Sequence, residues 1–174
     1  MPSIRCIQIS CEHNCSVELD YCYSIYAGLP KSETSRVQTV YNAAARLIFG
    51  ASRYSPITSL LRDRLHWLRC TDQIQYKLCI TVFKALHGMV PEYLTELCTP
   101  AVVGEKRAVL RSASTRHGLM NIPRRTLNTN FGDRAFRVAG PAAWNSLPTN
   151  IRTTSTIESF KRQLKTHFFT ISYS

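Results

Sequence analysis

The chain has 174 residues, of which 44% are hydrophobic, so it is long enough for one domain with a buried core. Its 22 Lys and Arg outnumber its 11 Asp and Glu, and residues 101–174 hold twelve of these basic residues but three of the acidic ones. This surplus predicts contact with a polyanion, because Lys and Arg that neutralise phosphates release condensed counterions. A membrane surface is the weaker alternative, because no basic amphipathic segment has the apolar face that membrane anchoring needs. No apolar run is long enough for a signal peptide or a membrane span, which favours a soluble protein.

The cysteines indicate an intracellular protein with reduced thiols. Their number is odd, and they stand at positions 6, 11, 15, 22, 70, 79 and 98. The last three lie inside helical patterns, which is not typical of a secreted disulfide framework. The cluster Cys6, Cys11, His13 and Cys15 lacks the second ligand pair of a structural zinc site, so we expect no metal there. Residues 1–18 have no regular periodicity, and we interpret them as a disordered N-terminus.

The first strongly helical pattern begins at Lys31. Ser32 or Ser35 is expected to cap this helix, and Gly50 to end it. The apolar residues recur at spacings of three and four, which predicts one buried stripe. Its members are Val37, Val40, Ala44, Leu47 and Ile48.

Three further helices are expected before residue 100. Ser55 and Pro56 are typical of an N-cap and a first helical position, opening a short helix through Leu60 and Leu61. Thr71 is expected to cap the longest helix of this region, and Gly88 to end it. Its buried stripe is predicted to comprise Ile74, Leu78, Val82 or Phe83, and Leu86. Pro91 opens the fourth helix, and short connections predict a bundle with antiparallel neighbours.

The pattern changes after Pro100. The segments "KRAVLRSAS" and "HGLMNIPR" alternate weakly between apolar and polar residues, which predicts two short strands. The next segment, "DRAFRVA", is expected to be a helix with Asp133 in its first turn. Gly140 is expected to end that helix and Pro141 to start another turn, so that the backbone bends between Phe136 and Trp144.

The last helix is expected in "STIESFKRQLKTHFF". Ser155 and Glu158 have capping-box spacing at its start. The apolar residues at three- and four-residue spacing are Ile157, Phe160, Leu164 and Phe168, while Lys161, Arg162 and Lys165 fall largely on other faces. The predicted fold class is therefore mainly α: a helical bundle, then a small mixed region with short β-strands, then a C-terminal helix.

Enzymatic motifs are absent from the sequence. It has no glycine-rich phosphate loop, no G-x-S-x-G, no H-E-x-x-H and no C-x-x-C. His66 and His87 adjoin helix ends, where a hydrogen-bonded histidine is more common than a catalytic base. The four aspartates are far apart in sequence, so no two-metal centre is predicted. They are Asp20, Asp63, Asp72 and Asp133.

Basic side chains are the remaining candidates for function, as a surface that follows a phosphate backbone. The alternative is a solvated basic face that keeps the domain soluble. Trp144, Phe136 and Phe160 stand at helical apolar spacings and are expected in the core rather than as stacking platforms for bases. The candidate nucleic-acid-binding residues are Arg107, Arg111, Arg116, Arg124, Arg125, Arg134, Arg137, Lys161, Arg162 and Lys165.

Six segments in one order resemble the C-terminal part of a known family. They are "LDYCYSIYAGLPKS", "VQTVYNAAARLIFG", "YSPITSLLRDRLHWL", "YKLCITVFKALHGMVPEYLTEL", "FGDRAFRVAGPAAWNSLP" and "SFKRQLKTHFF". The family is the endonuclease and reverse transcriptase of jockey-like LINE (non-long-terminal-repeat) retrotransposons. The likeness runs from about Leu19 to Phe169, and it departs from the family at Arg69 and Cys70, where a proline is expected, and in residues 1–18.

The resemblance implies a thumb-like helical region in residues 19–100 and a basic C-terminal region in residues 101–174. The family's paired aspartates, which bind catalytic magnesium in the palm, have no match in this sequence. The chain is therefore expected to be a truncated RNA-directed DNA polymerase that cannot polymerise and needs no cofactor itself. Its expected partners are RNA or an RNA–DNA duplex, bound without sequence preference, and the missing palm domain, with no membrane. The alternatives are a relic without function and a host-domesticated interaction domain.

Overall fold

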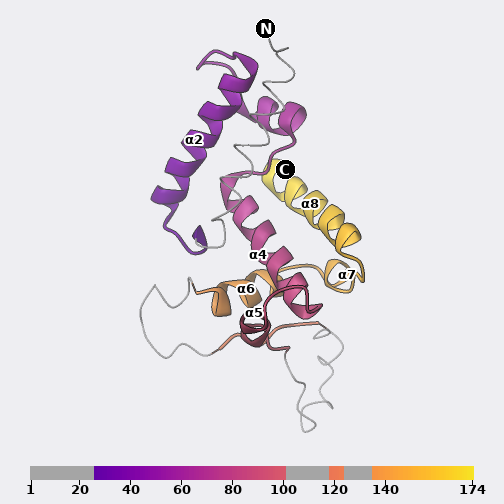
Figure 1. Ribbon diagram of the computed structural model, residues 1–174. Coiled ribbons are helices and arrows are strands. Elements are labelled where there is room, and N and C mark those ends of the chain that lie inside the picture. Colours follow the sequence, from indigo (N-terminus) through magenta and orange to yellow (C-terminus); the bar gives the residue numbers. More distant parts are fainter. Residues whose placement is uncertain (1–25, 101–117, 124–134) are drawn as a thin grey trace.

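The computed structural model describes residues 26–100, 118–123 and 135–174, and within these ranges the chain is mainly helical, as predicted (Figure 1). The elements in chain order are α2 (Lys31–Phe49), α3 (Ile57–Ser59), the π-helix η2 (Leu60–Leu65), α4 (Cys70–Leu86), α5 (Glu92–Leu97), α6 (Phe136–Asn145), α7 (Thr149–Arg152) and α8 (Ile157–Tyr173). The described residues form no strand. Pro100 and Met120 make one isolated antiparallel bridge, with Met120 inside the second predicted strand, and the first predicted strand lies outside the described residues.

Helix α4 is the centre of the fold. Its buried residues include Ile74, Leu78 and Val82 at four-residue spacing, and also Cys79 and Phe83, so more than one face of the helix is covered. A helix with apolar residues on several faces is stable when neighbours pack on each of them. Helices α2, α5, α6 and α8 all contact α4, which confirms the predicted core stripe of this helix apart from its last member, the exposed Leu86.

Three aromatic rings from three helices meet at the C-terminal half of α4. Phe83 stacks on Phe160 of α8 with ring centroids 4.4 Å apart, and Trp144 of α6 lies 5.6 Å from Phe160. The three side chains are each at most 1% exposed. Trp144 and Phe160 are thus core residues, as predicted, whereas Phe136 is half-buried at the edge of the same cluster.

Helix α8 runs antiparallel to α4. Phe160, near the start of α8, stacks on Phe83 near the end of α4, and the hydroxyl of Ser172, near the end of α8, donates a hydrogen bond to Asp72 near the start of α4. Phe160, Leu164 and Phe168 of the predicted apolar stripe are buried, whereas its first member, Ile157, is half-buried. Figure 1 shows the two helices side by side.

The segment 118–123 is held on α6 by hydrogen bonds. The indole nitrogen of Trp144 donates to the carbonyl of Gly118 at 2.7 Å. The side chain of Asn145 accepts from the amide of Met120 at 2.8 Å and donates to its carbonyl at 2.9 Å. Because both backbone groups of the buried Met120 are paired, its burial leaves no polar group unsatisfied.

The prediction that Gly140 ends a helix and Pro141 begins another turn is wrong. Helix α6 continues through both residues, and both are buried. A Cβ on Gly140 would lie 3.1 Å from Val82 Cγ2 of α4, so the absence of a side chain lets the two helices approach closely. Pro141 lacks an N–H for the i−4 carbonyl, a local cost that the burial of its ring offsets. The predicted position of Asp133 lies outside the described residues.

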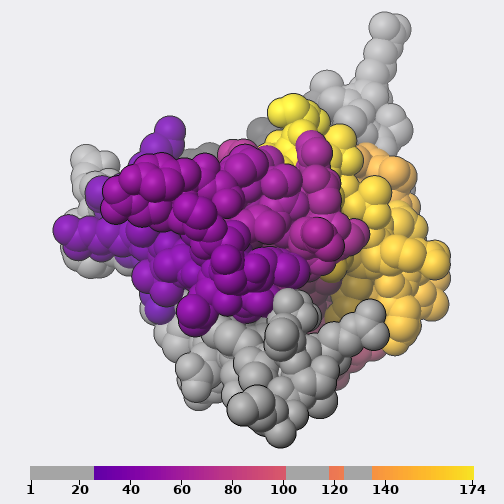
Figure 2. All heavy atoms as spheres, turned by 90° about the horizontal axis from the view of Figure 1, so that it is seen from above, coloured from indigo at the N-terminus to yellow at the C-terminus, as the bar shows by residue number. Residues whose placement is uncertain are grey.

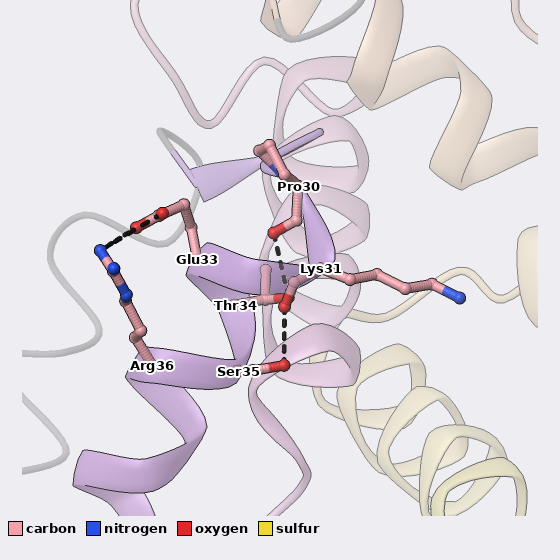
Figure 3. A network of polar contacts seen from close by, with 6 residues as sticks. All are labelled: Pro30, Lys31, Glu33, Thr34, Ser35 and Arg36. Atoms are coloured by element: carbon pink, nitrogen blue, oxygen red, sulfur yellow. Dashed lines mark hydrogen bonds and ion pairs between the residues drawn. The ribbon is translucent and has the colours of Figure 1, made fainter.

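Helix α2 begins and packs differently from the prediction. Pro30 is its N-cap, and neither Ser32 nor Ser35 caps it. The hydroxyl of Ser35 instead donates to the carbonyl of Lys31 at 2.6 Å, one turn back (Figure 3). The buried residues are Tyr41, Ala45 and Ile48, whereas Val40 is 60% exposed and Leu47 is 78% exposed. The stripe is rotated because Tyr41 packs on Trp67, with ring centroids 4.9 Å apart. Gly50 ends the helix as predicted, with a φ of 57°.

Three other predicted caps are also displaced. Pro56, not Ser55, is the N-cap of α3, and Thr156, not Ser155, accepts the hydrogen bond from Ser159 at the start of α8. Thr71 does not cap α4. The amide of Cys70 donates instead to the side chain of Gln38 in α2 at 2.7 Å, so a residue 32 positions away satisfies the first turn of α4.

We expect Gly140→Ala to lower the free energy of unfolding by about 1 kcal/mol. Alanine favours a helix by up to about 1 kcal/mol over glycine, but overpacking against Val82 and Phe136 costs about 1–3 kcal/mol. Urea unfolding measures the change. The control Ala142→Gly, at an exposed position of α6, reports the propensity term alone. A more stable Gly140→Ala chain would contradict the close approach of α6 to α4.

Candidate nucleic-acid interface

Four of the ten predicted binding residues lie in the described part of the chain. Arg137 is exposed on α6, and Lys161, Arg162 and Lys165 are exposed on α8, as the helical spacing predicted. The other six lie outside the described residues: Arg107, Arg111, Arg116, Arg124, Arg125 and Arg134.

Two of these cations line one groove. The groove lies between α8 and His66, the residue after η2, and has a volume of about 480 Å³. We call it the α8 groove, and its lining residues are His66, Arg162, Lys165, Thr166, Phe169 and Thr170. In the view of Figure 2 the yellow end of α8 lies directly beside the magenta region of η2. Arg137 and Lys161 do not line the groove, so the structure separates the four exposed cations into two sets.

Helix α8 presents this lining because its two sides have different compositions. Phe160, Leu164 and Phe168 point into the core. Arg162, Lys165, Thr166 and Phe169 therefore occupy the adjacent face at spacings of three and four residues. The walls of the groove are mainly apolar, with the cations and hydroxyl groups at defined positions. Such a combination is typical of sites that take a ligand with an apolar body and a charged end.

His66 has an unusual backbone conformation. It follows the π-helix η2 and has a φ of 52°, in the left-handed region that few side chains adopt. Its amide and that of Trp67 both donate to the carbonyl of Leu61. The imidazole stacks on Phe169, with ring centroids 6.2 Å apart. π-Helices and left-handed residues are enriched at functional sites, so this turn supports a role for the groove.

A second hollow of about 280 Å³ adjoins the first and shares His66 and Lys165 with it. The shared residues show that the two hollows are neighbours on one surface. This hollow is more polar, and it adds another cation, Lys77, and three aromatic side chains. The aromatic side chains are Tyr41, Trp67 and Tyr76.

The last residues of α8 fix the position of the groove. The hydroxyl of Tyr173 donates to the carbonyl of Trp67 at 2.6 Å, and the guanidinium of Arg69 lies 5.6 Å from the centroid of the Tyr173 ring. Burial raises the pKa of Tyr173, which keeps its hydroxyl protonated as a donor. Together with the Ser172–Asp72 hydrogen bond, these contacts hold α8 against the turn that contains His66.

Sequence reasoning found two of the six lining residues. It missed His66, Thr166, Phe169 and Thr170 as neighbours of the cations. Phe169 carried a signal, because it is an aromatic residue one position outside the buried stripe of α8. His87, in contrast, lies at the end of α4 as predicted, where its Nδ1 is 2.8 Å from the carbonyl of Phe83.

The described ranges hold neither a metal-binding cluster nor a membrane-spanning helix. No group of three His, Cys, Asp or Glu side chains is placed there to hold a metal ion. None of the helices in these ranges is both long and apolar enough to cross a membrane. The N-terminal cluster of Cys6, Cys11, His13 and Cys15 lies outside them. The chain matched no known protein family, no characterised protein and no solved structure.

The described cysteines are buried and free, as the sequence predicted for the last three, and burial makes them poor nucleophiles. It raises the pKa of the Cys79 thiol from 9.0 to about 12. At about pH 8 the thiolate fraction is therefore about a thousandfold below that of an exposed cysteine.

We expect Cys79 in the folded chain to react with iodoacetamide at least about a thousandfold more slowly than in the urea-unfolded chain. In the unfolded chain the rate should level off above about pH 9.0, whereas in the folded chain it should continue to rise there, because burial opposes ionisation of the thiol. Mass spectrometry of the Cys79 peptide measures the rate. Equal rates in the two states would show that Cys79 is accessible.

Proposed function

We propose that the chain is the thumb and tail of a jockey-like LINE reverse transcriptase, and that it binds nucleic acid without sequence preference. The observation that carries the binding proposal is the α8 groove, where Arg162 and Lys165 lie on one exposed surface beside Phe169. The origin is supported by the six ordered segments and by the helical fold.

The chemistry of this surface suits a phosphate backbone. Arg162 and Lys165 are three residues apart on one helix, which places their Cβ atoms about 5–6 Å apart. Lys77 continues the positive charge into the adjoining hollow. Side chains that neutralise phosphates release condensed counterions, and this release drives binding that does not depend on sequence. The half-buried ring of Phe169 and the exposed hydroxyl groups of Thr166 and Thr170 add contacts that tolerate any base.

The proposal assigns catalysis to the missing palm. Two aspartates lie in the described residues, and each has another role: Asp63 forms an exposed ion pair with Arg62 at 2.7 Å, and Asp72 accepts the hydrogen bond from Ser172. Polymerisation requires carboxylates that converge on two metal ions. Magnesium would accordingly belong to the full-length polymerase and not to this chain.

The outer face of α2 supports a former contact with the palm. Val40 and Leu47 are large apolar side chains of α2, and each is at least 60% exposed. Val40 and Leu47 are seven residues apart, so they lie on one side of the helix. An apolar helix face of this kind is typical of a surface that packs against another domain.

Binding to an RNA–DNA duplex is expected to weaken at least about tenfold between 50 and 200 mM salt, because the groove and the basic C-terminal region contact phosphates. Fluorescence anisotropy of a labelled duplex measures the dissociation constant. Binding that does not change with salt, or no binding at 50 mM salt, would contradict the proposal.

A matched pair of variants locates the interface within this test. Arg162→Gln with Lys165→Gln should make the binding constant less sensitive to salt, by the equivalent of up to about two phosphate contacts. Arg137→Gln with Lys161→Gln removes the same charge outside the groove and should change it little. If the two pairs of substitutions lower the salt dependence equally, the chain still binds through its charge, but the α8 groove is not the preferred interface.

The origin has a separate test in the DNA upstream of the first codon. A broken polymerase gene predicts a sequence there that encodes the palm with its paired aspartates, either in frame or after a frameshift. Genomic sequencing reads it directly. An upstream region with no trace of a palm in any frame would contradict the retrotransposon origin.

A further inference from the structure

We propose that the α8 groove is a binding site for a single unstacked nucleotide, with its base on Phe169 and its phosphate between Arg162 and Lys165. The inference rests on the proposed function and makes it more specific, because binding of a duplex backbone needs no pocket for a base. Four observations support it: the size of the groove, its charge, its hydrogen-bonding groups and its rigidity.

The size of the groove suits one small ligand. Its volume of about 480 Å³ is within the range of about 300–1,000 Å³ that is usual for ligand pockets. Its mainly apolar walls include the ring of Phe169, which is half-buried and so presents part of its surface to the groove. A base stacks on such a ring whatever its identity, because every base has a π-face. Paired bases inside a duplex are not available for this contact.

The charge of the lining selects an anion. Arg162 and Lys165 are exposed, and none of the described residues that line the groove is acidic. One phosphate can contact two cations at this helical spacing. The ligand that fits therefore has an aromatic body and a negative group at one end.

The two threonines present hydrogen-bond acceptors. The hydroxyl of Thr166 donates to the carbonyl of Arg162, and the hydroxyl of Thr170 donates to the carbonyl of Thr166, both at 3.0 Å. With their hydrogens used inside α8, the oxygens keep lone pairs for a donor in the groove. The exocyclic amine of adenine or cytosine is such a donor.

The groove is already formed without a ligand. The ring of Phe169 contacts those of His66 and Tyr173, with ring centroids 6.2 and 5.0 Å away. Tyr173 is in turn fixed by its hydrogen bond to Trp67. The turn at His66 is held by the amides of His66 and Trp67, which both donate to the carbonyl of Leu61. Preformed walls reduce the entropy that is lost on binding.

The test is an NMR titration of the whole chain with adenosine 5′-monophosphate and with ribose 5-phosphate. We expect the monophosphate to shift the amides of Thr166, Phe169 and Thr170 and to bind at least about fivefold more tightly than ribose phosphate, the lower limit for one stacked base. Phe169→Leu should weaken the monophosphate at least about fivefold and leave ribose phosphate unchanged. Equal affinities for the two probes would overturn the proposal.

Two further variants keep the test decisive. Thr166→Glu introduces a carboxylate at an exposed position one helical turn from Arg162 and next to Lys165, so it should abolish binding without affecting the core even if Phe169→Leu unfolds the chain. Lys161→Gln, which lies outside the groove, is the control and should bind as the parent chain does. If Thr166→Glu binds the monophosphate normally, the groove is not the site.

A second titration distinguishes a free nucleotide from one in a strand. A single-stranded oligoadenylate should compete with the monophosphate, and its binding should be sensitive to Phe169→Leu. A blunt duplex should bind Phe169→Leu and the parent chain equally, because it contacts charge alone. If the oligoadenylate does not compete with the monophosphate, the site is restricted to free nucleotides. If neither the parent chain nor Phe169→Leu binds the duplex, the proposed function is contradicted but the pocket is not.

Discussion

The stacking of Phe83 on Phe160 connects the two halves of this chain. Phe83 belongs to the long central helix α4, Phe160 belongs to the last helix, and Trp144 completes the contact from α6. Aromatic pairs of this geometry contribute beyond the area that they bury. Because α8 is held here and at Asp72, its outer face has a fixed position, and the α8 groove exists as a consequence. The hydrophobic core thus includes residues from both sides of residue 100.

Local sequence patterns predicted the helices whose apolar stripes face the hydrophobic core. The stripes of α4 and α8 repeat at helical spacing and meet the same aromatic cluster, so periodicity alone located most of them. The caps and the face of α2 depend on contacts that are distant in sequence. Gln38 supplies the cap that Thr71 was expected to provide, and Tyr41 turns toward Trp67. Gly140 and Pro141 remain helical because of tertiary packing, since both are buried and Gly140 lies close to Val82 of α4.

The candidate site was predictable only as a set of exposed cations. Helical spacing placed Arg162 and Lys165 away from the core, and both are exposed. The groove itself requires His66, which follows the π-helix η2 and has a left-handed backbone conformation. No sequence pattern indicated either feature. It also requires the bond from Tyr173 to Trp67, which joins residues 106 positions apart. The chemistry of single residues could be predicted from the sequence, but which of these residues lie together in the fold could not.

The dependence of α4 on the final helix has a consequence for synthesis. Phe83, Leu78 and Val82 are made long before Phe160 and Leu164, which cover them in the folded chain. Until α8 has left the ribosome, one face of α4 has no partner in the core. Apolar surface that is exposed in this way attracts other chains and chaperones. The core around α4 therefore closes only after α8 has been synthesised.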